Sequence, residues 1–103
     1  MKYTAGIRKR LEKIVKHHDD YTLPQFLLAL RCAYGIRRVR VEEDTHIPEL
    51  RLYYIERQRN VQPLRRWEVF TLADYYDIAR SLLLGKSNAW SGSGINVGRY
   101  GKK

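Results

Sequence analysis

Apolar residues recur at every third or fourth position over most of the chain, which is the spacing of helices that bury one face. The first such segment covers residues 4–18 and carries basic residues on its other side. The next covers Leu23–Tyr34, where Thr22 supplies a capping hydroxyl, Pro24 suits a first helical turn and Gly35 ends the helix. The pattern therefore predicts two consecutive amphipathic helices.

Two shorter helical segments follow at residues 38–45 and 48–59. Only His46 and Ile47 separate them, and a connection of this length leaves room only for a tight turn. The sequence thus predicts two abutting helices in the middle of the chain.

A loop is expected at residues 60–63, followed by helices at 64–76 and 77–84. From Gly85 onward the chain is rich in Gly, Ser and Asn without apolar periodicity, which predicts a flexible tail. The expected fold class is all-α, a compact bundle of five or six short helices. Its core is expected to contain Phe26, Leu27, Leu30, Val41, Ile47, Leu52, Ile55, Trp67, Phe70 and Leu72.

A length of 103 residues suits one domain with short extensions. We expect a basic N-terminal helix over residues 1–20, a helical domain over 21–85 and a flexible basic tail over 86–103. The apolar runs are too short for a transmembrane helix, and the start lacks the pattern of a secretory signal, so we expect a cytoplasmic protein. The single cysteine, Cys32, is expected to fill the core.

The charge balance favours a polyanionic partner. Twenty Lys and Arg against eleven Asp and Glu give a net charge of +9 and favour nucleic acid or an acidic membrane surface. A basic face that is simply solvated is the alternative.

Ten residues, from the end of the helix at 23–34 through the two middle helices, occupy positions with a defined spacing along the chain. They are Leu30, Arg31, Gly35, Ile36, Val41, Ile47, Leu52, Ile55, Glu56 and Arg57. Over residues 23–84 this spacing resembles the DNA-binding domain of the phage-repressor-like (XRE-type) helix-turn-helix family. The resemblance implies a lambda-repressor-like fold, a transcriptional regulator, most simply a repressor of a bacterium, plasmid or phage, and a homodimer on double-stranded DNA. It also implies a largely buried ion pair between Arg31 and Glu56.

Three positions depart from the family pattern. Glu42 stands where a small residue is usual, Thr45 where leucine is usual, and His46 at a turn that favours glycine because it needs a positive φ. Either Glu42 leans outward or the two helices separate slightly.

The resemblance also implies the residues that would meet DNA. The base-contacting set is Arg38, Glu49, Leu50, Arg51, Tyr53 and Tyr54. The phosphate-contacting set is Arg37, Arg40, Arg59, Arg65 and Arg66. The first helix and the tail residues Arg99, Lys102 and Lys103 could add further phosphate contacts. The dimer contacts would come from Ile78, Leu82 and Leu83, with Trp90 and Tyr100.

Two other functions stay open. Leu50, Tyr53 and Tyr54 are also typical of a protein-binding surface, so the alternative is a helix-turn-helix scaffold that binds another protein, for example a phage- or plasmid-encoded modulator of a host protein. The amphipathic segment 4–18 could also lie on a membrane surface, an interpretation that ranks last.

Catalysis, metal binding and a cofactor are not expected. His17, His18, Asp19 and Asp20 are possible metal ligands, but adjacent residues rarely point at one ion. The sequence has no glycine-rich phosphate loop, nucleophile elbow or paired catalytic carboxylates, so we do not expect an enzyme.

Overall fold

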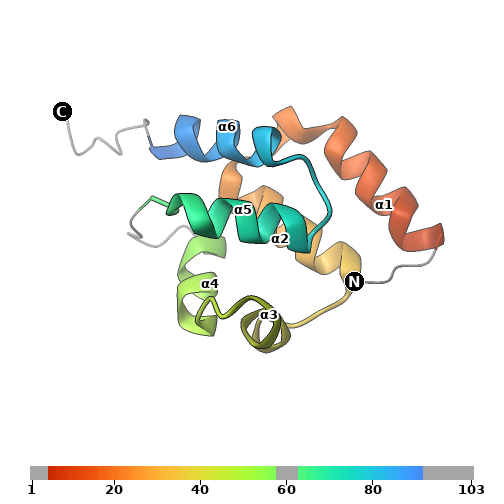
Figure 1. Cartoon of the computed structure of the whole chain (residues 1–103). Coiled ribbons are helices and arrows are strands. Elements are labelled where there is room, and N and C mark those ends of the chain that lie inside the picture. Colours follow the sequence, from red (N-terminus) through yellow and green to blue (C-terminus); the bar gives the residue numbers. More distant parts are fainter. Residues whose placement is uncertain (1–4, 58–62, 92–103) are drawn as a thin grey trace. The chain divides into compact units, whose positions relative to one another are not determined.

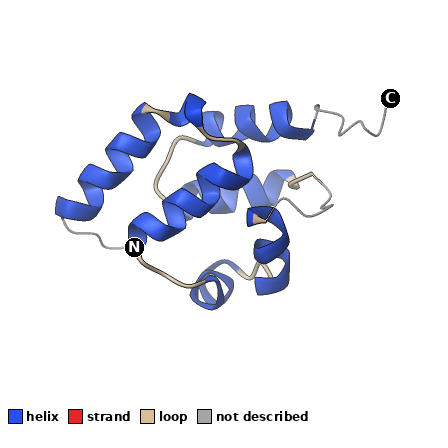
Figure 2. Ribbon diagram, turned by 180° about the vertical axis from the view of Figure 1, so that it is seen from behind, coloured by secondary structure: helices blue, strands red, loops and turns tan. Residues whose placement is uncertain are grey.

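The computed structural model describes residues 5–57 and 63–91. These residues form six α-helices and one short 3-10 helix, with no strand among them (Figures 1 and 2). The predicted all-α class and number of helices are therefore confirmed. The chain divides into two compact units, Met1–Val61 and Gln62–Lys103. None of the helices in the described ranges is both long and apolar enough to cross a membrane.

The first unit contains the predicted helices of the N-terminal half. They are α1 (Ala5–Lys16), a 3-10 helix (His18–Asp20), α2 (Leu23–Tyr34), α3 (Arg38–Thr45) and α4 (Glu49–Glu56). Helix α2 contacts both α1 and α4, and α3 contacts α4 (Figure 1). The helix expected up to residue 18 ends at Lys16, and the 3-10 turn replaces its last residues.

Helix α2 has the bounds that its capping residues predict. The Thr22 hydroxyl accepts from the Gln25 backbone N–H at 3.4 Å, and the Gln25 side chain accepts from the Thr22 N–H at 3.0 Å. These reciprocal bonds satisfy two amides that a helix start leaves unpaired. At the other end Gly35 has φ 69°, a left-handed conformation that glycine adopts at no steric cost, and its N–H donates to Arg31 and Cys32 carbonyls.

The core of the first unit comes from one face of each helix. Its buried apolar residues are Leu11, Leu23, Phe26, Leu27, Leu30, Ala33, Tyr34, Val41, Ile47, Leu52 and Ile55. Cys32 is exposed, so its expected role in the core is wrong. The buried face of α2 follows the three-four spacing through Leu23, Phe26, Leu27 and Leu30, and Cys32 lies on the opposite side of the helix.

The second unit contains α5 (Arg66–Tyr75) and α6 (Arg80–Ser91), which contact each other. The expected boundary between them is wrong, because Asp77 adopts φ 58° and is not helical. The next amide, that of Ile78, donates to the Ala73 carbonyl at 2.9 Å, the closure that ends a helix after a left-handed residue. Aspartate takes the place that glycine usually fills, since its short polar side chain tolerates this conformation.

Helix α6 also continues beyond the point where a flexible tail was expected. Gly85 lies inside the helix, and the following residues to Ser91 remain helical. A glycine inside a helix costs about 1 kcal/mol relative to alanine. The contacts of α6 with α5, and the burial of Leu83 and Ser87 on either side of Gly85, offset this cost. The remaining tail, residues 92–103, lies outside the described residues.

The buried face of α5 is offset from the expected one. Glu68, Val69, Leu72 and Ala73 are buried, whereas Trp67 is 47% exposed. Trp67 was predicted to be in the core and is not, because it falls on the opposite side of α5 from Val69. Phe70, predicted to be in the core, is half-buried.

An exposed ion pair lies on the surface of the second unit, between Asp74 and Arg80. The Arg80 Nε donates to Asp74 Oδ1 at 2.9 Å, and the Arg80 guanidinium lies 4.8 Å from the centre of the Phe70 ring. This hydrogen bond, aided by the positive charge of Arg80, holds the pKa of the Asp74 carboxyl below its usual value.

Candidate nucleic-acid interface

The helices α3 and α4 form a pair of abutting helices joined by residues 46–48 (Figure 1). His46 adopts φ 65°, and its backbone N–H donates to the Glu42 carbonyl at 2.8 Å. Histidine thus occupies the left-handed position that favours glycine. The Thr45 hydroxyl donates to the Val41 carbonyl at 2.7 Å and accepts from the Ile47 N–H at 3.2 Å. Thr45 is therefore buried with its hydroxyl satisfied.

Helix α4 has one buried and one exposed face. Leu52, Ile55 and Glu56 are buried. On the opposite side Leu50 is 61% exposed and Tyr54 is 40% exposed. The inner face fixes α4 against its neighbours in the first unit, so the outer face is accessible to a partner.

Glu56 is the centre of a buried charge cluster that joins three helices. Its side chain is 3% exposed and accepts from Arg31 of α2 through both carboxylate oxygens, at 2.9 and 3.0 Å. Arg31 also donates to the Ile36 carbonyl at 2.8 Å. The Glu56 Oε1 atom accepts in addition from Arg38 Nη1 of α3 at 3.3 Å. The pair expected between Arg31 and Glu56 is present, with Arg38 as a third member. We name Arg31, Arg38 and Glu56 the charge cluster.

This geometry places Arg38 differently from the sequence expectation. Its guanidinium lies against Glu56 and 5.1 Å from the centre of the Tyr53 ring, with the side chain 24% exposed. Its Nε atom is buried, and no group of the described residues accepts a hydrogen bond from it. As placed, Arg38 holds α3 to α4 and does not extend outward, so we remove it from the base-contacting set.

Glu42 supplies the cap that α4 lacks. Pro48 precedes α4 and has no side chain that can accept from its first amides. Instead, the Glu42 Oε1 atom of α3 accepts from the Glu49 backbone N–H at 2.9 Å. A carboxylate here is also favoured by the positive end of the helix dipole. Glu42 therefore leans outward, the first of the two alternatives, and ties the two helices together.

The remaining base-contacting candidates lie on α4. Glu49 is exposed, whereas Arg51 and Tyr53 are half-buried. The Tyr53 ring contacts Tyr54 edge-on and lies 5.4 Å from the Arg57 guanidinium. The most accessible candidates are thus Glu49, Leu50 and Tyr54.

The phosphate-contacting candidates are divided between the two units. Arg37 and Arg40 are exposed at the start of α3, and Arg40 pairs with Asp44 at 3.0 Å. Arg65 and Arg66 are exposed at the start of α5, which belongs to the second unit. Arg59 lies outside the described residues. In the first unit the described candidates are therefore Arg37 and Arg40.

Charges in the helix pair balance. Residues 37–57 contain five arginines and five acids. These are Arg37, Arg38, Arg40, Arg51 and Arg57, and Glu42, Glu43, Asp44, Glu49 and Glu56. The net charge of +9 therefore comes from other parts of the chain.

Two other sets of residues were singled out from the sequence. His17 Nδ1 lies 3.9 Å from Asp20 and His18 Nδ1 lies 3.2 Å from Asp19, and nowhere in residues 5–57 and 63–91 do three or more potential metal ligands meet. Among the expected dimer contacts, Leu83 is fully buried, and Ile78 and Leu82 are half-buried. Leu83 is therefore removed from that set. The Trp90 side chain and Tyr100 lie outside the described part.

Comparison of the chain with models of known families, with curated proteins and with solved structures finds no match.

Proposed function

We propose that the chain binds double-stranded DNA through α3 and α4, with the outer face of α4 in the major groove, and acts as a transcriptional repressor in the cytoplasm. The observation that carries the proposal is the two-faced α4, whose inner side is anchored by Leu52, Ile55 and Glu56 and whose outer side is exposed. A helix held in this way by a preceding short helix suits the major groove, which is wide enough to admit it.

The exposed residues of α4 give this contact a definite chemistry. Glu49 can accept from the amino group of a cytosine, and Leu50 can pack on the methyl group of a thymine. The Tyr54 ring can pack on a base edge, and its hydroxyl can donate to a base or a phosphate. Arg37 is exposed at the start of α3 and can pair with the phosphate backbone.

The test is selection of duplexes from a random library, followed by titration of the selected duplex and of a scrambled one. We expect Leu50→Ala and Tyr54→Ala to weaken binding to the selected duplex by about tenfold each, the usual size of a lost base contact. Binding to the scrambled duplex should change little, because phosphate contacts carry no sequence information. Circular dichroism and urea unfolding check that each variant is folded.

Lys9→Ala is the matched control, because Lys9 is exposed on α1 and takes no part in the proposed base contacts. It should leave the ratio of the two affinities unchanged. If Leu50→Ala and Tyr54→Ala also leave that ratio unchanged, the outer face of α4 does not contact bases and the proposal fails.

The proposal includes a homodimer that binds two half-sites about one helical turn, or 34 Å, apart. Selected duplexes should then contain a repeated half-site at that spacing, and sedimentation should give two chains per duplex. A single half-site bound by one chain would contradict the dimer while leaving the groove contact in place.

A second candidate function, binding to another protein, is favoured by a different observation. Val39, Leu50 and Tyr54 are 44%, 61% and 40% exposed on a helix pair whose charges cancel. Aromatic and aliphatic side chains on a neutral surface are also typical of protein interfaces. Failure of the chain to bind any duplex at low salt would favour this function over DNA binding.

A further inference from the structure

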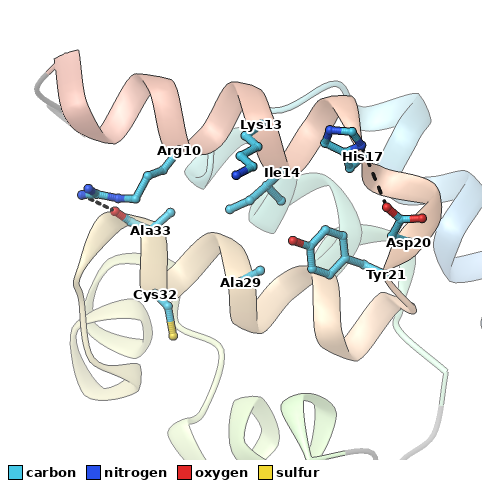
Figure 3. A pocket seen from close by; sticks show the side chains of 9 residues that line it. All are labelled: Arg10, Lys13, Ile14, His17, Asp20, Tyr21, Ala29, Cys32 and Ala33. Atoms are coloured by element: carbon cyan, nitrogen blue, oxygen red, sulfur yellow. Dashed lines mark hydrogen bonds and ion pairs between the residues drawn. The ribbon is translucent and has the colours of Figure 1, made fainter.

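A groove between α1 and α2 lies apart from the helix pair discussed above. It has a volume of about 620 Å³, within the range of ligand-binding cavities, and nine residues line it (Figure 3). Arg10, Lys13 and Ile14 of α1 face it at helical spacing, and His17, directly after the helix, continues the same side. The groove is therefore formed by one face of α1 turned toward α2.

The small size of the α2 residues leaves this space open. Ala29 and Ala33 form the α2 side, where larger side chains would have filled the gap between the helices. One end is closed by Arg10, whose Nη2 atom donates to the Ala33 carbonyl at 3.4 Å. Tyr21 lies at the other end, and its hydroxyl points into the groove in Figure 3. Ile14, Ala29 and Ala33 thus form an apolar floor, and Arg10 and Tyr21 form its polar ends.

Positive charge dominates the rim. In Figure 3 the side chains of Arg10 and Lys13 extend from α1 toward α2. No carboxylate of the described residues pairs with either of them, and Asp20, the acid that lines the groove, lies beside His17. Arg10 and Lys13, both exposed on α1, thus present two positive charges to the groove.

We propose that this groove binds a small organic anion, a carboxylate or sulfonate attached to an apolar ring or short chain. The anionic group pairs with the guanidinium of Arg10 and the ammonium of Lys13, since a guanidinium keeps further N–H donors after one is used by Ala33. The apolar part lies over Ile14, Ala29 and Ala33. This site is independent of the proposed DNA contact.

The first test uses 8-anilinonaphthalene-1-sulfonate, an aromatic anion whose fluorescence rises in an apolar site. N-phenyl-1-naphthylamine, which has the same rings without the sulfonate, is the uncharged comparison. We expect the anion to bind at least about tenfold more tightly than the uncharged amine, because charge-assisted hydrogen bonds are lost with the sulfonate. Equal affinity for both probes would contradict the assignment of Arg10 and Lys13.

Two double variants of equal net charge separate the groove from general attraction to a basic protein. Arg10→Gln with Lys13→Gln removes the two cations of the rim, whereas Lys9→Gln with Lys16→Gln removes two exposed cations of α1 outside the groove. The first should weaken binding of the anionic probe about tenfold or more, and the second less than twofold. Equal weakening in both would overturn the proposal.

A variant that fills the groove tests its location. Ala29→Leu places a larger side chain on the floor and should block both probes, while unfolding in urea shows whether the chain keeps its fold. If this variant does not fold, amide NMR of the unmodified chain replaces it. Shifts caused by the anionic probe should then be confined to α1 and α2, and shifts elsewhere would place the probe outside the groove.

Competition with carboxylates distinguishes an anion that carries an apolar chain from one that carries an aromatic ring. Displacement of the probe by octanoate identifies a chain acid as the preferred ligand, and displacement by 1-naphthoate identifies an aromatic acid. Failure of both carboxylates to displace the probe would overturn the proposal. Displacement by duplex DNA but by neither carboxylate would assign the rim to nucleic-acid phosphates instead.

Discussion

Helix α1 and residues 37–57, which contain α3 and α4, have the same number of Lys and Arg but differ in their contacts. Residues 5–16 of α1 have five Lys and Arg and one acid, Glu12, whereas residues 37–57 have five arginines and five acids. In the helix pair, Arg38 pairs with Glu56 and Arg40 with Asp44. In α1, Arg10 and Lys13 instead face an open groove. Arg38 and Arg40 of the helix pair are therefore engaged with acids of the same pair, whereas Arg10 and Lys13 of α1 line a groove.

The net charge of the chain is not located on the helix pair proposed to bind DNA. A charge of +9 favours a polyanionic partner, but the helix pair itself contributes none of it. Long-range attraction to DNA would come from other parts of the chain, and the α3–α4 surface would act through short-range contacts. Substitution of single charges in the helix pair, each matched by a control charge on α1 or on α3 itself, separates these two contributions.

The largest effect is expected for Glu56→Gln. The variant leaves Arg31 and Arg38 partly buried without a carboxylate, and breaking a buried pair costs about 3 kcal/mol or more. Urea unfolding measures the loss. Glu12→Gln on α1 is the control, because Glu12 is exposed, and it should change the unfolding free energy by less than about 0.5 kcal/mol. Similar losses in both variants would show that the buried charge cluster contributes no more to the unfolding free energy than an exposed charge does.

The residues of this cluster also mark where sequence reasoning succeeds and where it stops. The family resemblance implies the contact of Arg31 with Glu56, which is present, and the spacing of apolar residues predicts the buried faces of α2 and α4. The family resemblance places Arg38 among the residues that would face the bases. Its actual direction depends on how Glu56 and Tyr53 lie across the two helices, which helical periodicity does not encode.

The helix ends were harder to predict for a similar reason. Thr22 and Gly35 are strong local signals, and α2 has the predicted bounds. The Gly-, Ser- and Asn-rich sequence from Gly85 onward predicts a flexible tail, yet α6 continues to Ser91 because packing outweighs the low helix propensity of one glycine. Glu42 looked like a mismatch in the helix pair, and its value as a cap appears only when α4 begins beside it.

Glu42→Ala should cost about 1 kcal/mol, the usual size of a lost helix cap. The substitution removes the acceptor of the Glu49 amide and one of the links between α3 and α4. Glu43→Ala is the matched control, since Glu43 is exposed on the same helix and alanine suits both positions equally well. If the two variants are equally stable in urea, the Glu42 bond contributes nothing measurable.

Arg37→Gln tests where phosphate contacts lie, provided that the chain binds DNA. The slope of log affinity against log salt concentration should become less steep by about 0.9, the value for one phosphate contact. Lys9→Gln on α1 should leave the slope unchanged, because the proposal places the phosphate backbone along α3. A change in the slope for Lys9→Gln, with none for Arg37→Gln, would move the electrostatic contact to α1.

Asp44→Asn is expected to have the smallest effect on stability. Its pair with Arg40 joins residues four apart on an exposed helix surface, and such pairs contribute about 0.3 to 0.5 kcal/mol. The same substitution removes this ion pair and makes the helix pair positive by one charge, so binding to any duplex should tighten at low salt. Glu12→Gln adds the same charge on α1 and is the control for a general effect of net charge. If Asp44→Asn tightens binding no more than Glu12→Gln does, then Arg40 lies away from the DNA, and the balanced charges of α3–α4 serve the fold alone.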